Sequence, residues 1–285
     1  MSGAGGRNGA LRAHDAGDAG GATPAGGPFV IGLGEVGRRL LAALDASGVR
    51  PRPVTRSAGW EAALDPADPA ARIVAVREED LAEAWRRFEP ALRPRLVLVQ
   101  NGFLESLVGG AGEPAAAARG LIWFTAKGGF FRELMPSLFR GEAAGPVAAA
   151  LSRGGLAARE VSDRAAFRRE LVLKGAWNAV VGLPLAAHGV DLATYRSSYA
   201  AELAALVDES CRAASAEYGI EVTGDDARAR LEATTGELGW VRGGTRALAF
   251  RNGAIARFGR RHGVPTPVTD RLLRAVGYAA EEALP

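Results

Sequence analysis

Short apolar runs alternate with amphipathic stretches through the first 160 positions of this chain. Continuous apolar runs are typical of strands covered on both faces, and a period near 3.6 is typical of helices. The pattern predicts helices over 36–46, 78–88 and 146–151, and strands at 29–31, 52–56, 73–76, 96–99, 121–124 and 157–161. Strands that alternate with helices in this way favour a parallel, doubly wound sheet.

The pattern changes after Ser162, where almost every residue to the end fits a helical period. Asp163 is a plausible helix N-cap, and Gly219 and Gly263 are expected helix stops. The predicted fold class is therefore α/β, with an N-terminal Rossmann-like doubly wound parallel sheet over 28–162 and an all-α C-terminal domain over 163–285. Residues 1–27 are rich in Gly, Ala and Asp, and we expect a disordered tail there.

A glycine motif follows the first predicted strand and opens the first predicted helix. Gly32 permits a tight turn, Gly34 lets a pyrophosphate approach the backbone, and Gly37 lets helix and strand pack closely. The free N–H groups of the helix then face the phosphates. A coincidental strand, turn and helix is the alternative. The dinucleotide interpretation assigns six residues to the cofactor: Gly32, Leu33, Gly34, Glu35, Val36 and Gly37.

The second predicted strand ends without the acidic residue that binds the ribose 2′-hydroxyl of NAD in many such folds, since no acid lies between Asp45 and Glu61. Arginines and hydroxyls occupy this region instead, and a guanidinium matches phosphate oxygens in a bidentate fork. The sequence therefore favours NADP, with Arg56 as the first candidate for the 2′-phosphate. Alternatively, each of these arginines is a solvated loop charge.

Three further polar residues are candidates for the chemistry. Asn101 follows the strand at 96–99, where it either contacts the nicotinamide ribose or substrate, or forms an Asn-Gly turn. Lys174 and Asn178 are four residues apart, so they share one face of an apolar helix. A desolvated lysine has a lowered pKa and is suited to protonate a carbonyl oxygen that receives a hydride. Alternatively, the lysine snorkels and the asparagine bonds a neighbouring helix.

Composition narrows the function classes. The 285 residues are 48% hydrophobic, enough for two cores, and the net charge of +3 is spread along the chain, so no nucleic-acid partner is expected. No apolar run reaches 18 residues, which argues against a membrane span. The one cysteine, Cys211, excludes an internal disulfide and is expected to be structural. We expect a cytoplasmic protein that needs no metal.

With these motifs in place, the chain resembles the ketopantoate reductase family, the 2-dehydropantoate 2-reductases. The resemblance runs from about Phe29 to Leu273 and rests on the glycine motif, Gln100-Asn101-Gly102, Lys174-xxx-Asn178, Arg251-Asn252-Gly253 and His262-Gly263-Val264-Pro265. It implies that NADPH delivers hydride, that Lys174 is the general acid, and that Asn178 and Asn101 bind substrate. The related β-hydroxyacid dehydrogenases share the Lys-xxx-Asn spacing.

The chain departs from the family pattern at two places. Gly182-Leu183-Pro184 stands where the family has Asn-Pro, and Arg246-Ala247 stands where it has Thr-Glu. The family serine before that glutamate corresponds to Thr235, which keeps a hydroxyl. With Ala247 in place of an acid and Arg251 one turn later, we expect a more cationic pocket that suits a larger or more acidic 2-oxo acid than ketopantoate.

The predicted function is NADPH-dependent reduction of a 2-oxo acid, with the proton from Lys174 and with Asn178, Asn101, Thr235 and Arg251 as substrate ligands. One alternative is a catalytically impaired NADP-binding sensor or partner protein. Another is a reductase of an imine or opine-like substrate. A homodimer formed through the helical domain is a further possibility.

Overall fold

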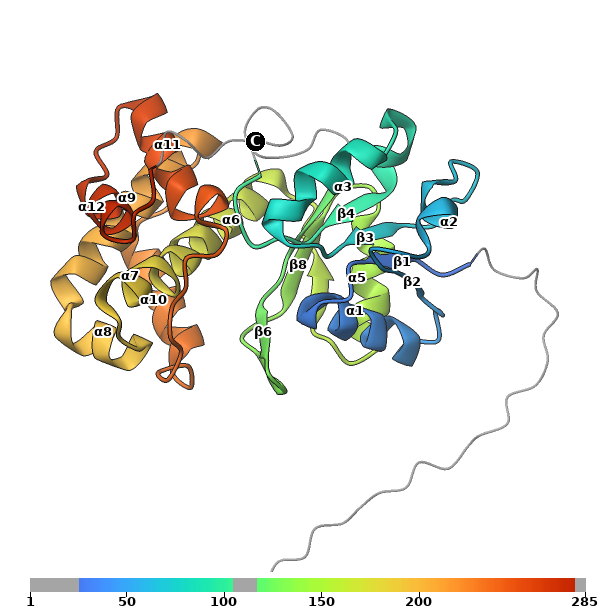
Figure 1. Ribbon diagram of the computed structural model, residues 1–285, viewed down its shortest axis with the longest axis horizontal. Helices are drawn as coiled ribbons and strands as arrows, with labels where there is room; N and C mark the ends of the chain where they lie inside the picture. The colour runs from blue at the N-terminus through green and yellow to red at the C-terminus, as the bar shows by residue number, and fades with distance from the viewer. Residues whose placement is uncertain (1–25, 105–116, 280–285) are drawn as a thin grey trace, which may run out of the picture.

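The chain forms a sheet domain followed by a helical domain, as Figure 1 shows. The computed structural model describes residues 26–104 and 117–279. The tail predicted at residues 1–27 lies almost wholly outside the described residues. The last strand of the sheet ends at Glu160 and the first long helix of the second half begins at Arg164. This helix, α6, runs along the border between the two halves (Figure 1).

Within the described part of the chain, seven strands form the main sheet in the order β2-β1-β3-β4-β5-β8-β9. The strands are β1 (Phe29–Ile31), β2 (Arg52–Val54), β3 (Arg72–Val74), β4 (Leu96–Leu98), β5 (Ala118–Leu121), β8 (Ser137–Arg140) and β9 (Ala158–Glu160). The first five run parallel to one another, whereas β8 pairs with β5 in antiparallel fashion and β9 runs parallel to β8. The sheet is therefore mostly parallel, as predicted. In the register of the sheet, Val30 of β1 is paired with Pro53 of β2 on one side and with Ile73 of β3 on the other.

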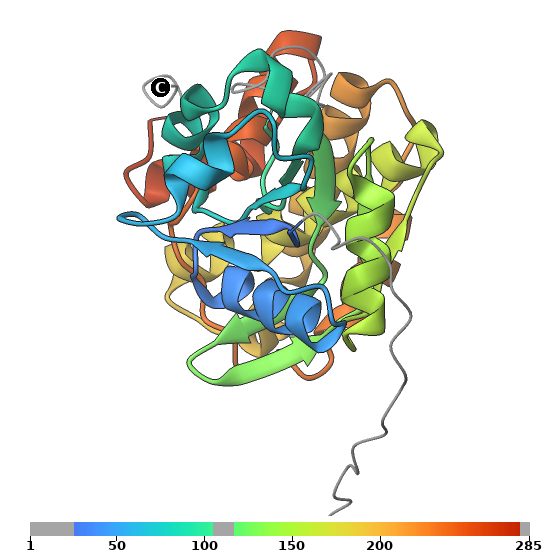
Figure 2. The ribbon, with the colours of Figure 1, turned by 90° about the vertical axis from the view of Figure 1, so that its right-hand side faces the viewer.

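Helices cover both faces of this sheet (Figure 2). They are α1 (Glu35–Ala46), α2 (Trp60–Leu64), η1 (Glu78–Asp80), α3 (Leu81–Arg87), η2 (Pro90–Arg95) and α5 (Ala144–Arg153). Because side chains alternate along a strand, Val30 packs with α1 and α5 while its neighbour Ile31 packs with α3 on the other face. Full burial on both faces explains why these strands are continuous apolar runs, and it confirms the doubly wound fold.

The strand predicted at 121–124 is wrong in its bounds. β5 ends at Leu121, and β6 (Phe124–Lys127) forms a separate two-stranded sheet with β7 (Phe130–Glu133). At Trp123 the backbone N–H donates to the Ser137 hydroxyl at 3.0 Å and the carbonyl accepts from Leu134 at 2.8 Å. Within one apolar run the chain thus passes from the main sheet to the two-stranded sheet. Hydrophobic periodicity does not reveal this change of strand pairing. Strands β7 and β8 were also not predicted.

Among the described residues of the second half, every named element is a helix. Its elements are α6 (Arg164–Val180), α7 (Leu183–His188), α8 (Leu192–Ser198), α9 (Ala200–Tyr218), α10 (Gly224–Thr235), η3 (Leu248–Phe250), α11 (Asn252–His262) and α12 (Pro267–Ala275). The predicted N-cap is confirmed, since the Asp163 carboxylate accepts from the Ala165 N–H. Gly219 and Gly263 end their helices with φ of 63° and 65°, as expected of glycine stops.

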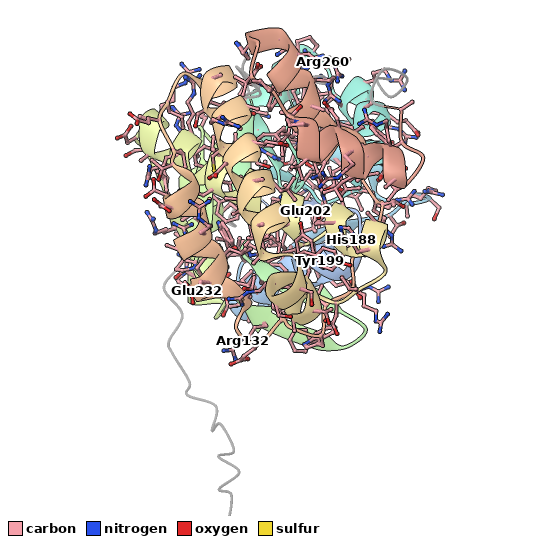
Figure 3. All side chains as sticks on the ribbon, turned by 90° about the vertical axis from the view of Figure 1, so that its left-hand side faces the viewer. Arg132, His188, Tyr199, Glu202, Glu232 and Arg260 are labelled. Atoms are coloured by element: carbon pink, nitrogen blue, oxygen red, sulfur yellow. The ribbon has the colours of Figure 1, made fainter. Side chains whose placement is uncertain are left out.

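Glu202 of α9 joins four helices on the outer face of this domain (Figure 3). Its carboxylate accepts from His188 Nε2 at 2.8 Å, Tyr195 Oη at 3.1 Å and Arg271 at 2.7 Å. The His188 ring in turn stacks on Tyr199, with ring centres 4.1 Å apart. The cluster connects α7, α8, α9 and α12 around one partly buried acid.

The structure also bears on two expectations drawn from composition, which concern Cys211 and membrane-spanning helices. Cys211 is buried, and its pKa is raised to about 12 by burial first and then by Asp208, so the thiol is protonated and structural. Within the ranges 26–104 and 117–279, no helix combines the length and apolar character that crossing a membrane requires.

Candidate active site

The glycine motif forms an open turn between β1 and α1. Gly32 has φ of 92°, which favours glycine, and a Cβ on Gly37 would lie 1.9 Å from the Gly32 carbonyl oxygen. A Cβ on Gly34, by contrast, would meet no atom within 4 Å. Two glycines are therefore required by the fold itself, whereas Gly34 leaves the space at the helix N-terminus that a pyrophosphate needs.

The other predicted motif residues surround this turn. Leu33 lines the cleft beside it, and Val36 packs against the hydrophobic core below. The Glu35 carboxylate accepts from the Gly128 N–H at 2.8 Å. Since Gly128 lies at the tip of the β6-β7 hairpin, this bond fastens the hairpin to the first turn of α1.

A cleft of about 670 Å³ extends from the glycine turn across the carboxyl ends of β1, β2 and β3. Arg56, the residue predicted for the 2′-phosphate, lines this cleft together with Trp60, Arg77, Asp80 and Arg87. The open glycine turn and the three arginines suit the pyrophosphate of a dinucleotide. Sequence reasoning missed Arg77 because it follows β3 rather than β2, and only the sheet order brings the two strand ends together.

The cleft also contains acids. Arg77 Nε donates to Asp80 at 2.9 Å, and this bond holds the pKa of Asp80 below its usual range. The guanidinium of Arg87 lies 4.6 Å from the centre of a Trp60 ring. Arg56 thus lies beside a paired Arg77–Asp80 unit rather than in a purely cationic site.

Lys174 lies on α6 and is 3% exposed. Its Nζ is 4.1 Å from the centre of a Trp123 ring and 4.2 Å from that of Trp177, and it makes no hydrogen bond to any group in 26–104 or 117–279. Burial first, and then the charges of Arg251 and Arg230, lower the pKa of Lys174 to about 7. The predicted desolvation is thus confirmed, and the lysine is suited to exchange a proton near neutral pH.

The structure brings Asn178, Asn101 and an unpredicted acid together. Asn178 Nδ2 donates to the backbone oxygen of Asn101, whose own N–H donates to Glu78 Oε1 at 3.2 Å. The Asn101 side-chain oxygen is buried and has no hydrogen-bond partner in the described part of the chain. A buried acceptor of this kind is available to a bound ligand.

Arg251 adjoins the same group. One of its terminal nitrogens lies 3.3 Å from Glu78 Oε1, and its Nε is buried without an acceptor among the described residues. The positive charge expected at Arg251 is therefore compensated by Glu78 from η1. Sequence reasoning searched for an acid close to Asn252, but the two partners are 173 positions apart.

Ala247 lies at the junction of the domains. Its φ is 54°, its side chain packs with Phe250 against the core under α3, and its N–H donates to Glu79 Oε1 at 2.8 Å. Phe250 also accepts a backbone hydrogen bond from Phe103 at 2.6 Å. Adjacent carboxylates of η1 thus contact the 247–251 segment at two points, so the sheet domain contributes directly to the site.

Thr235 is buried at the end of α10. Its hydroxyl donates to the Leu231 carbonyl at 2.6 Å and accepts from Arg196 at 3.3 Å. The preceding Thr234 accepts from the Trp177 indole at 3.0 Å, so this helix end reaches the rings around Lys174 through Thr234. A role for Thr235 as a substrate ligand stays a prediction.

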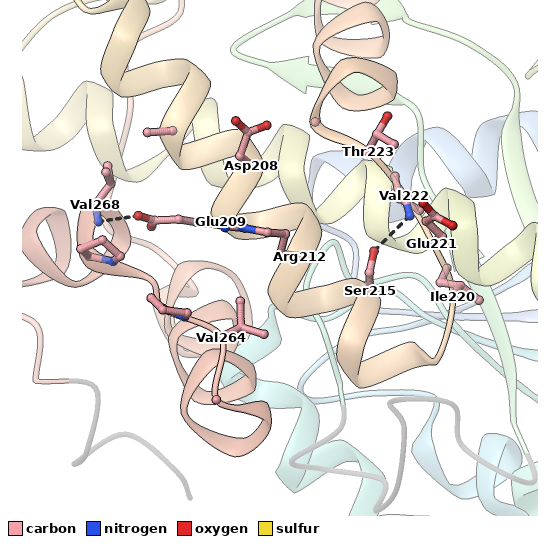
Figure 4. Close-up of a pocket in the computed structure, with 15 residues that line it drawn as sticks. Asp208, Glu209, Arg212, Ser215, Ile220, Glu221, Val222, Thr223, Val264 and Val268 are labelled. Atoms are coloured by element: carbon pink, nitrogen blue, oxygen red, sulfur yellow. Dashed lines mark hydrogen bonds between the residues drawn. The ribbon is translucent and has the colours of Figure 1, made fainter.

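A second cavity, of about 980 Å³, lies between α9, the start of α10 and α12 (Figure 4). Its buried acid, Glu209, accepts from the Val268 and Thr269 N–H groups at 2.7 and 2.9 Å. Asp208 pairs with Arg228 at 2.7 Å. These bonds stabilise helix ends, and the cavity contains none of the predicted site residues.

The chain has the fold of the ketopantoate reductases. D-mandelate dehydrogenase, solved with NADH, superposes with a TM-score of 0.67 at 18% identity over 88% of this chain and 97% of its own. A putative ketopantoate reductase from Ralstonia solanacearum MolK2 superposes with a TM-score of 0.66 at 20% identity over 89% and 97%. Ketopantoate reductase from Staphylococcus aureus gives 0.63 at 15% identity over 88% and 99%. Neither a protein-family model nor a curated protein sequence matches the chain.

Proposed function

We propose that this protein is an NADPH-dependent reductase of a 2-oxo acid. The observation that carries the proposal is Lys174, a buried lysine with its pKa near 7 beside the paired Asn178 and Asn101. Similarity in fold to ketopantoate reductases and to D-mandelate dehydrogenase supports the same reaction class. At this level of identity it does not specify a substrate.

Each residue has a distinct task in this mechanism. The glycine turn would hold NADPH, which when bound would supply hydride to the keto carbon. Lys174 donates a proton to the carbonyl oxygen as negative charge develops there, and its low pKa favours that transfer near pH 7. Arg251, with its unpaired Nε–H, binds the substrate carboxylate. Asn178 and Asn101 orient the keto acid between these groups.

We infer a preference for NADPH over NADH. Arg56 and Arg77 line the cleft where the adenosine ribose is expected, and a 2′-phosphate meets two guanidiniums there. Asp80 opposes this preference, because it pairs with Arg77 and repels phosphate. Titration of the protein with each cofactor, followed by nicotinamide fluorescence, tests the inference. Tighter binding of NADH would contradict it.

The proposal is tested by following NADPH oxidation with a panel of 2-oxo acids. We expect turnover with at least one acid, and a loss of about 10²–10⁴-fold in kcat for Lys174→Met because the proton donor is removed. NADPH affinity is expected to stay unchanged. Arg212→Ala, in an exposed residue of the α9 cavity, is the matched control and is expected to keep full activity.

Two outcomes of the panel have separate meanings. Full activity in Lys174→Met would reject the assigned acid while leaving a reductase. Tight NADPH binding without turnover of any acid would favour a nicotinamide-binding sensor instead.

We also propose that two copies pair through their helical domains. The Staphylococcus aureus neighbour is a dimeric ketopantoate reductase, and it covers 88% of this chain. Light scattering coupled to size exclusion measures the mass directly, and a monomer at micromolar concentration would reject the pairing.

A further inference from the structure

Both arginines whose charges act on Lys174 are paired with glutamates. Arg230 makes two hydrogen bonds to the Glu170 carboxylate, at 2.6 and 3.0 Å, and the two side chains are 21% and 17% exposed. Arg251 pairs with Glu78, at 25% and 13% exposure. Each glutamate offsets part of the charge of its arginine, so the largest uncompensated positive charge that these groups offer a ligand is that of protonated Lys174.

Glu78 is held in place from two sides. Its Oε1 accepts from the Asn101 N–H at 3.2 Å as well as from Arg251, so the carboxylate is fixed between the end of β4 and the start of α11. It reaches this position from η1, directly after β3. The neighbouring Glu79 differs, because it binds the Ala247 backbone N–H and pairs with no arginine within residues 26–104 and 117–279.

This arrangement discriminates between ligands by charge. One carboxylate is attracted by Lys174 and by the Nε–H of Arg251 that Glu78 leaves free. A second carboxylate gains less from an arginine whose charge Glu78 partly offsets, and it is repelled by Glu78. Like charges brought together in a partly desolvated site repel each other and weaken binding.

We propose that Glu78 is a specificity-determining residue, which neutralises Arg251 and thereby restricts the site to 2-oxo acids with a single carboxylate. The inference rests on the proposed reductase function. It reverses the expectation, drawn from Ala247, that a more acidic substrate suits this pocket.

The test uses two acids with the same five-carbon chain, 2-oxopentanoate and 2-oxoglutarate, which differ only in the terminal carboxylate. We expect the wild-type protein to prefer 2-oxopentanoate in kcat/KM. In Glu78→Gln the ratio is expected to shift toward 2-oxoglutarate by about ten-fold, since Arg251 then presents a full charge. Glu79→Gln is the matched control, because its amide oxygen still accepts from Ala247, and its ratio is expected to equal that of wild type.

An unchanged ratio in Glu78→Gln, or an equal shift in Glu79→Gln, would overturn the inference. If Glu78→Gln does not fold, Glu78→Ala is a second neutral variant without an amide to accommodate. Glu78→Asp keeps the charge and is expected to keep the wild-type preference.

A binding measurement separates the two proposals. In the presence of NADPH, we expect 2-oxopentanoate to raise the Tm of wild type, and 2-oxoglutarate to raise only that of Glu78→Gln. This pattern without turnover in any variant would support the role of Glu78 in binding and reject the reductase function. Turnover of 2-oxopentanoate with no change of preference in Glu78→Gln would reject the role of Glu78 and keep the reductase.

Discussion

At the scale of single residues, some surroundings of Lys174 disfavour its positive charge and others stabilise it. Burial and the fields of Arg251 and Arg230 favour the neutral amine. The faces of Trp123 and Trp177, both near 4 Å from Nζ, favour the ammonium. The lysine is thereby kept close to the point where both forms are populated, which is the requirement for a general acid at neutral pH.

This balance predicts the pH dependence of turnover. Reduction requires protonated Lys174, so kcat/KM for the reduction should fall as pH rises through about 7. The groups that face the amine are the two indoles, Arg251 with Glu78, and Arg230 with Glu170. Rates measured from pH 5.5 to 9 check this. A profile that stays flat to pH 9 would show that Lys174 is not the proton donor, or that its pKa is close to that of an ordinary lysine.

At the scale of elements, the glycines of the turn between β1 and α1 have two different roles. Some are required by the fold, and one leaves room for the cofactor. Gly37 is required for the helix to pack on the turn, and Gly32 for the turn itself. Gly34 has φ of −67°, which any residue adopts, and its Cβ direction is open. Its glycine therefore serves the ligand and not the fold.

Matched alanine variants test this separation. Gly34→Ala should change the free energy of unfolding by less than about 1 kcal/mol and should weaken NADPH binding, because the new methyl group occupies the approach of the pyrophosphate. Gly37→Ala should destabilise the fold by about 1–3 kcal/mol through the clash with the Gly32 carbonyl. Chemical denaturation and NADPH titration measure the two effects. Unaltered NADPH affinity in Gly34→Ala would exclude this turn as the cofactor site.

At the scale of the whole molecule, the two domains meet at the site and each contributes charged groups to it. Glu78 and Glu79 extend from the sheet domain to the 247–251 segment of the helical domain. Glu202 lies on the outer face of the helical domain, where it joins four helices (Figure 3). Burial alone raises the pKa of Glu202, but hydrogen bonds from His188, Tyr195 and Arg271 outweigh it, and the pKa is lowered.

A lowered folded-state pKa makes Glu202 a source of stability above the pKa of the unfolded chain, which is lost as pH falls through the folded value. Glu202→Gln should therefore lower the free energy of unfolding at pH 7 by about 1–3 kcal/mol. The difference from wild type should shrink toward pH 3, because the carboxylate becomes increasingly protonated as pH falls. Urea denaturation at the two pH values measures this, with the exposed Glu232→Gln as control. A deficit that is equal at both pH values would assign the effect to packing rather than to charge.

The sequence determined those features that depend on neighbours within one element. The glycine turn, the Asp163 cap, the glycine stops and the shared helical face of Lys174 and Asn178 all follow from spacings of a few residues, which local geometry fixes. Tertiary structure decided the partners of these groups. Glu78 reaches Arg251 across 173 positions, Arg77 joins Arg56 through the sheet order, and Trp123 lies against Lys174 after the chain leaves the sheet. Such contacts depend on how whole elements pack, and no periodicity along the chain records them.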